Sequence, residues 1–229
     1  MKQYNEVLNK IKGGLIVSCQ ALETEPLYSS YIMSRMAHAA FLGGAVGIRA
    51  NTPEDIIEIK KVVDLPIIGL YKQVFADSEV YITPTYEAVD AIVAAKADIV
   101  AVDATNRLRP NNISLEEFVQ TIRKKYPEQL FMADCSCYED AQHAEELGFD
   151  LVGTTLRGYT KDTSQIEIPD YNLLKKLSET LTIPVIAEGG IWSPEQLKQA
   201  FDCKVYAAVI GTAITRPMEI TKRYVEAIK

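Results

Sequence analysis

The sequence over residues 183–217 reads IPVIAEGGIWSPEQLKQAFDCKVYAAVIGTAITRP, and this stretch decides the fold. Two short apolar runs, Val185–Ala187 and Tyr206–Ile210, are typical of buried strands and enclose one helical segment, Pro194–Phe201. Ser193 offers a hydroxyl cap directly before the proline, which suits the first helical position. Strands that alternate with helices pair in parallel, because the crossover returns the chain in the same direction. The stretch therefore predicts one β-α-β unit.

The same unit recurs from the start of the chain to its end. Six further apolar strands are predicted, over Leu15–Cys19, Val46–Ile48, Pro66–Tyr71, Ile99–Val102, Leu130–Ala133 and Leu151–Gly153. Helices are predicted over Ser30–Leu42, Pro53–Val63, Tyr86–Ala95, Leu115–Lys125, Tyr138–Leu147, Tyr171–Thr180 and Pro217–Ile228. Eight such units close a barrel, and the 229 residues are near the usual ~250 of this fold. We therefore predict the α/β class, as a single-domain (β/α)8 TIM barrel over residues 1–229.

Composition and charge narrow the functional classes. The net charge of -7 and the pI near 5.0 argue against nucleic acid as a partner, since that binding needs a basic face. No apolar run approaches the ~20 residues that span a membrane, and the first residues lack the apolar core of a secretory signal. A cytoplasmic protein that acts on a small molecule is the expectation.

Cysteine and histidine offer little to catalysis or to metal binding. The spacing of Cys135 and Cys137 is too short for a typical zinc pair, so the four cysteines are interpreted as structural or incidental thiols. His38 and His143 both fall inside predicted helices, away from the strand ends. Acid-base chemistry is therefore expected from lysine, carboxylate or tyrosine, with no metal and no cofactor.

Polar residues follow most of the predicted strands where the apolar runs end. In a barrel of this type, the loops after the strands form the mouth, and catalytic groups lie there. The predicted rim holds Gln20, Arg49, Lys72, Asp103, Asp134, Glu188 and Gly211.

Glycine-bearing loops after the last two strands predict a phosphate site. Gly189 and Gly190 follow the seventh strand, and Gly211 and Thr212 follow the eighth. Phosphate often binds between these two loops of a barrel, because glycines let backbone amides approach it. The alternative is that the glycines only form tight turns. Two such loops on neighbouring strands favour a phosphorylated ligand.

Two rim residues are the candidates for proton transfer. Lys72, crowded by Arg49 or desolvated in the mouth, loses its proton more readily and can act as a base or a Schiff-base amine. The alternative is a solvated lysine at the start of a loop. Glu188 follows an apolar run and is the second candidate. Arg49 suits an oxygen that gains negative charge, and Gln20 can orient a polar group. Asp134 is expected to contact the substrate. For Asp103 two roles stay equally open, a substrate contact and the fixing of a loop by side-chain hydrogen bonds.

The residues along the whole chain also resemble one known family. The resemblance rests on GGLIVSCQAL, EPL, GGAVGIRA, LPIIGLYK, YITPT, VAVDAT, RPN, MADCS, GFDLVGTTLRGYT, IPVIAEGGI and VIGTAITRP, which run from Gly14 to about Thr221. The chain resembles the N-acetylmannosamine-6-phosphate 2-epimerases. The resemblance implies inversion at C2 of N-acetylmannosamine 6-phosphate to N-acetylglucosamine 6-phosphate, without a cofactor, in the breakdown of amino sugars such as sialic acid. It implies Lys72 as the acid/base, Glu188 as its carboxylate partner, and substrate contacts from Gln20, Arg49, Asp134 and Arg216.

Several points stay open from the sequence. Inversion needs protons on both faces of C2, either from Lys72 and Glu188 or from one base that serves both faces. An aldolase that forms an imine at Lys72, or a sugar-phosphate-binding barrel without activity, are the alternative functions. Loop residues Tyr81, Thr83 and Tyr159 are each able to cover the sugar. Ile220, Tyr224, Val225 and Ile228 form a helical stripe that is expected to pack on its own barrel or on a neighbour, and a homodimer is expected.

Overall fold

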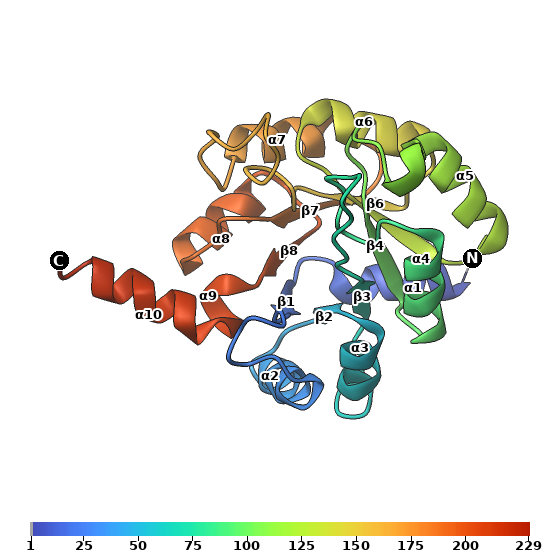
Figure 1. The fold of residues 1–229 in the computed structure, drawn as a ribbon. Helices are drawn as coiled ribbons and strands as arrows, with labels where there is room; N and C mark the ends of the chain where they lie inside the picture. The colour runs from blue at the N-terminus through green and yellow to red at the C-terminus, as the bar shows by residue number, and fades with distance from the viewer. Residues whose placement is uncertain (1) are drawn as a thin grey trace.

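Eight parallel strands close a barrel in the order of the sequence (Figure 1). The computed structural model describes residues 2–229, with side chains described from residue 6 onwards. The strands are β1 Leu15–Cys19, β2 Gly47–Asn51, β3 Ile67–Leu70, β4 Ile99–Asp103, β5 Leu130–Asp134, β6 Leu151–Gly153, β7 Val185–Glu188 and β8 Ala207–Ile210. β1 pairs in parallel with both β2 and β8, which closes the sheet. The predicted (β/α)8 barrel is confirmed.

Several polar residues expected just after the strands belong to the strands themselves. Arg49 pairs with Ile68 of β3, and Asp103 pairs with Asp134 at the ends of β4 and β5. The parallel ladder depends on backbone groups, so it continues past the point where the apolar side chains stop. These polar side chains are therefore fixed by regular backbone and not by loops.

The helices surround the barrel and match the predicted segments closely. They are α1 Lys2–Ile11, α2 Ser30–Leu42, α3 Pro53–Lys60, α4 Tyr86–Ala94, the 3-10 turn η1 Pro110–Asn112, α5 Leu115–Lys125, α6 Tyr138–Glu146, α7 Tyr171–Thr180, α8 Pro194–Asp202, α9 Thr212–Thr215 and α10 Pro217–Glu226. The sequence interpretation missed α1, η1 and α9. It also placed the end of α3 three residues late. Ser193 caps α8 as predicted, with its hydroxyl accepting from the N–H of Gln196.

The interior of the barrel is filled by apolar side chains, and α1 closes its N-terminal end. Ile16, Ile68 and Val209 from three strands form one buried cluster with Leu8 and Ile11 of α1. Each buried side chain of this size contributes roughly 1.5–3 kcal/mol through the hydrophobic effect. The bottom of the barrel is therefore plugged, and its top is left for a site.

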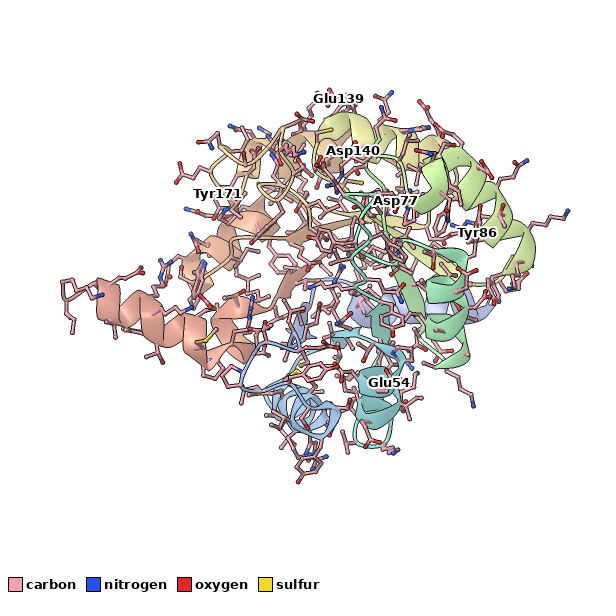
Figure 2. All side chains as sticks on the ribbon, viewed as in Figure 1. Glu54, Asp77, Tyr86, Glu139, Asp140 and Tyr171 are labelled. Carbon is pink, nitrogen blue, oxygen red and sulfur yellow. The ribbon has the colours of Figure 1, made fainter. Side chains whose placement is uncertain are left out.

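A second apolar cluster lies between the strands and the ring of helices. Tyr86 at the start of α4, labelled in Figure 2, stacks on Phe118 of α5 with ring centroids 5.1 Å apart. The guanidinium of the buried Arg109 also lies over the Phe118 ring, with its carbon 4.2 Å from the ring centroid. These contacts hold neighbouring helices at fixed positions outside the barrel.

The last helix does not pack on the barrel as the rest do. Figure 1 shows α10 running away from the barrel towards the C-terminus, and none of its residues is buried. Tyr224 is 74% exposed and Ile228 is 86% exposed. The expectation that this apolar stripe packs on its own barrel is therefore wrong. A helix must contact the sheet to bury its apolar face, and α10 leaves at an angle that prevents this contact.

None of the helices in residues 2–229 has the length and apolar character required to cross a membrane.

Candidate active site

A cavity of about 530 Å³ opens at the C-terminal ends of the strands. This volume is within the ~300–1,000 Å³ range of small-molecule sites. The cavity is lined by all the predicted site residues except Asp103 and Asp134, namely Gln20, Arg49, Lys72, Glu188, Gly189, Gly190, Gly211, Thr212 and Arg216. The Asp103 carboxylate accepts instead from the Thr105 hydroxyl at 2.7 Å and from Nη2 of Arg107 at 2.7 Å, within the loop after β4. The structure therefore brings together residues that are up to 196 positions apart, since Gln20 and Arg216 line the same cavity.

Arg49 on β2 is the centre of a buried charge network. Its Nη2 donates to Oδ2 of Asp134 at 2.6 Å, and its Nη1 donates to Oδ1 at 3.1 Å. The same Nη1 lies 3.0 Å from Oε2 of Glu188. Arg49 is 1% exposed and Asp134 is fully buried. Asp134 was predicted to contact substrate; in the structure its carboxylate does not line the cavity and pairs with the Arg49 guanidinium, which it holds in position.

Lys72 follows β3 and faces the cavity. Its backbone N–H donates to Oδ1 of Asn51 at 2.8 Å, which fixes the start of the loop. Burial and then the positive charge of Arg49 together lower the pKa of Lys72 to about 8, against the opposing effect of Glu188. Among the described residues, no acceptor forms a hydrogen bond or ion pair with the Lys72 amine. The amine can therefore lose its proton near neutral pH and is free to meet a ligand.

Glu188 ends β7 and is held by its neighbours on both sides. Burial raises the pKa of Glu188, Arg49 opposes this increase, and the charge of Asp134 reinforces it. The Thr154 hydroxyl accepts from the Glu188 N–H at 3.1 Å and donates to its carbonyl at 2.8 Å. The backbone of Glu188 is therefore fixed in the cavity wall, and its carboxyl group binds a proton more readily than that of an exposed glutamate.

Thr155 was missed by the sequence interpretation and lines the cavity beside Glu188. Its hydroxyl lies 2.6 Å from Oδ1 of Asp134 and 3.0 Å from Oε2 of Glu188. One hydroxyl proton can serve only one of these acceptors at a time. Gly153 makes room for this arrangement, because a Cβ there would lie 2.2 Å from the Met132 side chain and 3.2 Å from the Thr155 hydroxyl. Thr155 lies two residues after the end of a strand, and this position in the sequence could have identified it as a candidate site residue.

The two predicted phosphate loops line one side of the cavity. Gly189 and Gly190 adopt φ values of 108° and 74°, which side-chain-bearing residues rarely adopt. A Cβ on Gly190 would also lie 2.7 Å from the backbone carbonyl carbon of Ile168. On the neighbouring strand, Gly211 leads into α9, where the Thr215 hydroxyl donates to the carbonyl of Ser18 at 2.7 Å. The loops are held in place with their backbone towards the cavity.

Arg216 and Gln20 lie near each other across the β1 and β8 ends. Arg216 Nε donates to Oε1 of Glu25 at 2.8 Å, and Glu25, which the sequence interpretation missed, also lines the cavity. Gln20 Nε2 donates to the Ser18 hydroxyl at 2.8 Å, while its buried Oε1 has no partner among the described residues. An unpaired buried oxygen is costly, so Gln20 is suited to accept from a ligand hydroxyl or amide.

The remaining expectations separate into two groups. Tyr81 and Tyr159 line the cavity, whereas Thr83 is fully buried and donates to the carbonyl of Ala101 at 2.6 Å. His38 and His143 do not line the cavity, as predicted from their helical positions. In the described part of the chain, no three His, Cys, Asp or Glu side chains gather where they could hold a metal ion.

The charge of the cavity is opposite to that of the whole protein. Arginine and lysine contribute four cationic side chains to the wall, Arg49, Lys72, Arg216 and Arg223, against two carboxylates, Glu25 and Glu188. The protein itself carries a net charge of -7. A small anion with two negative charges therefore fits the cavity.

Comparison with known proteins gives the family. The family model described as "Putative N-acetylmannosamine-6-phosphate epimerase" matches residues 33–229. The chain belongs to the N-acetylmannosamine-6-phosphate epimerase family. A relative named "Putative N-acetylmannosamine-6-phosphate 2-epimerase" from Caldanaerobacter subterraneus is 53% identical over 224 residues, covering 98% of this chain and 94% of the relative. A relative of the same name from Listeria monocytogenes is 53% identical over 227 residues, covering 98% of both chains.

A solved structure agrees with this family assignment. The N-acetylmannosamine-6-phosphate 2-epimerase from Clostridium perfringens superposes with a TM-score of 0.92 at 51% identity, covering 96% of this chain and 95% of that one. Thiamine phosphate pyrophosphorylase from Pyrococcus furiosus, at 20% identity and a TM-score of 0.63, shares the fold alone. These comparisons confirm the family resemblance that the sequence motifs indicated.

Proposed function

We propose that this enzyme converts N-acetylmannosamine 6-phosphate to N-acetylglucosamine 6-phosphate by moving a proton at C2, without a cofactor, in amino-sugar (sialic acid) catabolism. The observation that carries the proposal is that an unpaired lysine with a lowered pKa and a glutamate with a raised pKa line one cavity of positive character. A base and an acid are both present at near-neutral pH, and the phosphate group has a site of matching charge.

The chemistry explains why these residue types are needed. The C2 proton becomes acidic only when C1 is an aldehyde, so the sugar ring opens first. Lys72, as the neutral amine, removes the C2 proton and leaves an enolate. Arg49 stabilises the negative charge that develops on oxygen, and such electrostatic help is often the largest contribution to lowering a barrier. Asp134 acts through Arg49, because its carboxylate orients the guanidinium at 2.6 and 3.1 Å.

The barrel topology supports a route with two acid-base groups. Lys72 follows β3 and Glu188 ends β7, and these strands are four apart in a closed ring of eight. They therefore lie on opposite sides of the barrel axis. A substrate held between them presents one face of C2 to each group. Lys72 removes the proton from one face, and Glu188 returns a proton to the other.

The other site residues bind the sugar and its phosphate. Gln20 accepts from a hydroxyl or the N-acetyl amide, and Arg216 contacts the sugar next to Glu25. The backbone N–H groups of Gly189, Gly190, Gly211 and Thr212 bind the phosphate, since the glycines expose their backbone to the cavity. Tyr81 and Tyr159 cover the sugar.

The protein is proposed to be a cytoplasmic, single-domain homodimer. The apolar side chains of Tyr224 in α10 and of Ile228 just after it are largely exposed in one copy of the chain. Exposed apolar residues grouped on one element commonly mark an interface. We propose that α10 packs against a second copy, which light scattering and Tyr224→Glu would test. A monomer for the unmodified protein would contradict this proposal.

Product analysis tests the proposed activity. The purified protein, without added metal or nucleotide, is expected to form N-acetylglucosamine 6-phosphate from the manno epimer, and Lys72→Met is expected to abolish this conversion. Borohydride separates the aldolase alternative, because it reduces an imine at Lys72 to a stable adduct and leaves a free amine unmodified. Inactivation by borohydride in the presence of substrate, with a mass increase on Lys72, would contradict the proposal.

A further inference from the structure

The cationic side chains of the cavity differ in whether a carboxylate of the protein already pairs with them. Arg49 is paired with Asp134 and Glu188, and the guanidinium of Arg216 is paired with Glu25. Lys72 is unpaired but must be neutral to act as a base. Arg223 is the remaining cation, and among the described residues no carboxylate or other acceptor contacts its N–H groups. A dianionic ligand therefore finds one guanidinium that the protein has not already neutralised.

Arg223 is held at the cavity by an aromatic side chain. Its guanidinium carbon lies 4.7 Å from the ring centroid of Trp192, which also lines the cavity. Stacking uses the face of a guanidinium and leaves the donors in its plane available. Trp192 itself is fixed, because its backbone N–H donates to Oε1 of Gln196 at 2.7 Å within the N-terminal cap of α8.

The location of this stacked pair is next to the glycine loops. Trp192 comes two residues after Gly190 in the loop that follows β7, and it lines the same cavity as Gly211 and Thr212. Arg223 comes from α10, a helix with no buried residue. The contact between Arg223 and Trp192 thus joins α10 to the barrel through side chains. This contact lies where the phosphate is expected.

We propose that Arg223 is a binding residue for the phosphate of the substrate, and that phosphate binding in turn fixes α10 against the barrel. The inference rests on the proposed function for the identity of the ligand. The in-plane donors of Arg223 bind phosphate oxygens while Trp192 holds the face of the guanidinium. Since coupling between two equilibria is reciprocal, a ligand that binds better when α10 is in place also stabilises that placement.

Titration with inorganic phosphate tests the binding role without requiring catalysis. We expect Arg223→Ala to weaken the binding of phosphate by roughly tenfold, the scale of one charge-assisted hydrogen bond at a partly exposed site. Arg223→Lys keeps the charge but loses the planar donors and is expected to recover only part of the affinity. The matched control is Lys222→Ala, which removes one positive charge from the same helix. Lys222 pairs with Glu219 at 2.9 Å and does not line the cavity.

The control separates a specific contact from general electrostatics. Calorimetry is expected to show near wild-type affinity for Lys222→Ala. If both variants weaken phosphate binding equally, or if neither does, the proposal is overturned. With the sugar phosphate as substrate, Arg223→Ala is expected to raise KM and leave kcat close to wild type, because the phosphate is remote from C2.

Hydrogen exchange tests the coupling to α10. Phosphate is expected to slow amide exchange over residues 217–226 in the wild-type protein and in Lys222→Ala, but not in Arg223→Ala. Unchanged exchange in the wild-type protein at saturating phosphate would overturn the coupling. A protein that binds phosphate through Arg223 but fails to epimerise the sugar would contradict the proposed function alone, so the two failures are distinguishable.

Discussion

Replacing Asp134 by asparagine tests the charge network beneath the cavity. The asparagine side chain would keep the shape of the aspartate and remove its charge, leaving Arg49 with Glu188 as its anionic partner. Arg49 and Asp134 are both almost fully buried and share two hydrogen bonds. Removing one partner of a buried pair costs about 3–5 kcal/mol, and the presence of Glu188 favours the lower end, about 3 kcal/mol.

The expected loss is large enough to measure by thermal unfolding. For a chain of this length, 1 kcal/mol corresponds to about 2–4 °C, so Asp134→Asn is expected to lower Tm by about 6–12 °C. The control is Glu219→Gln, which breaks an exposed pair with Lys222. Exposed pairs contribute about 0–1 kcal/mol, so this control is expected to unfold near the wild-type temperature. Equal Tm values for both variants would refute the reasoning that Asp134 holds Arg49.

The same substitution also changes the acid-base behaviour of the site. The charge of Asp134 helps to raise the pKa of Glu188, so its removal is expected to lower that pKa. Glu188 must carry its proton to act as the acid. The limb of the kcat/KM profile that titrates with Glu188 is therefore expected to lie at lower pH in Asp134→Asn than in the wild-type protein. A limb that moves to higher pH would contradict the assignment of Glu188 as the acid.

Three further predictions address single residues. Burial and the charge of Arg49 lower the pKa of Lys72 to about 8, and only the neutral amine is a base. The value of kcat/KM is therefore expected to fall about tenfold per pH unit as the pH decreases below about 8. A flat profile from about pH 6 to 9 would contradict this. Thr155→Val is expected to lower kcat about tenfold, the equivalent of one hydrogen bond, with little change in KM and with recovery in Thr155→Ser, as steady-state kinetics would show. Gly190→Ala places a Cβ against Ile168 at a φ of 74° and is expected to cost about 1–3 kcal/mol in urea unfolding, whereas Gly148→Ala, with a φ of 82° and open space, is expected to cost less.

The barrel could be predicted from the sequence because each strand carries its own local signal. Short apolar runs such as Leu15–Cys19 and Leu151–Gly153 are strands with the predicted bounds. The capped helix at Ser193 was likewise visible from a hydroxyl followed by proline. These features depend on residues close together in the chain, so local physical chemistry is sufficient to find them.

The pairing of the site residues could not be predicted in the same way. Arg49 and Asp134 are 85 positions apart, and Arg216 and Glu25 are 191 apart. Their contacts depend on the closure of the barrel and on which face of each strand a side chain leaves. The sequence predicted that Asp134 would reach the mouth, but not that it would pair with Arg49 and be absent from the cavity wall.

The orientation of the last helix was the main error. The apolar spacing of Ile220, Tyr224 and Ile228 correctly predicted a helix, but periodicity does not specify what the apolar face contacts. The proline at 217 begins α10 directly after α9, and the helix leaves the barrel from that point. A partner surface outside the chain has no signal in the spacing.

Proton exchange at C2 is the central claim, and NMR in deuterated water tests it most directly. The purified protein is incubated with N-acetylmannosamine 6-phosphate, without added metal or nucleotide. The account predicts that the gluco epimer forms with deuterium at C2, and that Lys72→Met forms none. Recovery of the starting sugar with its C2 proton intact, or formation of an epimer that retains this proton, would contradict the account.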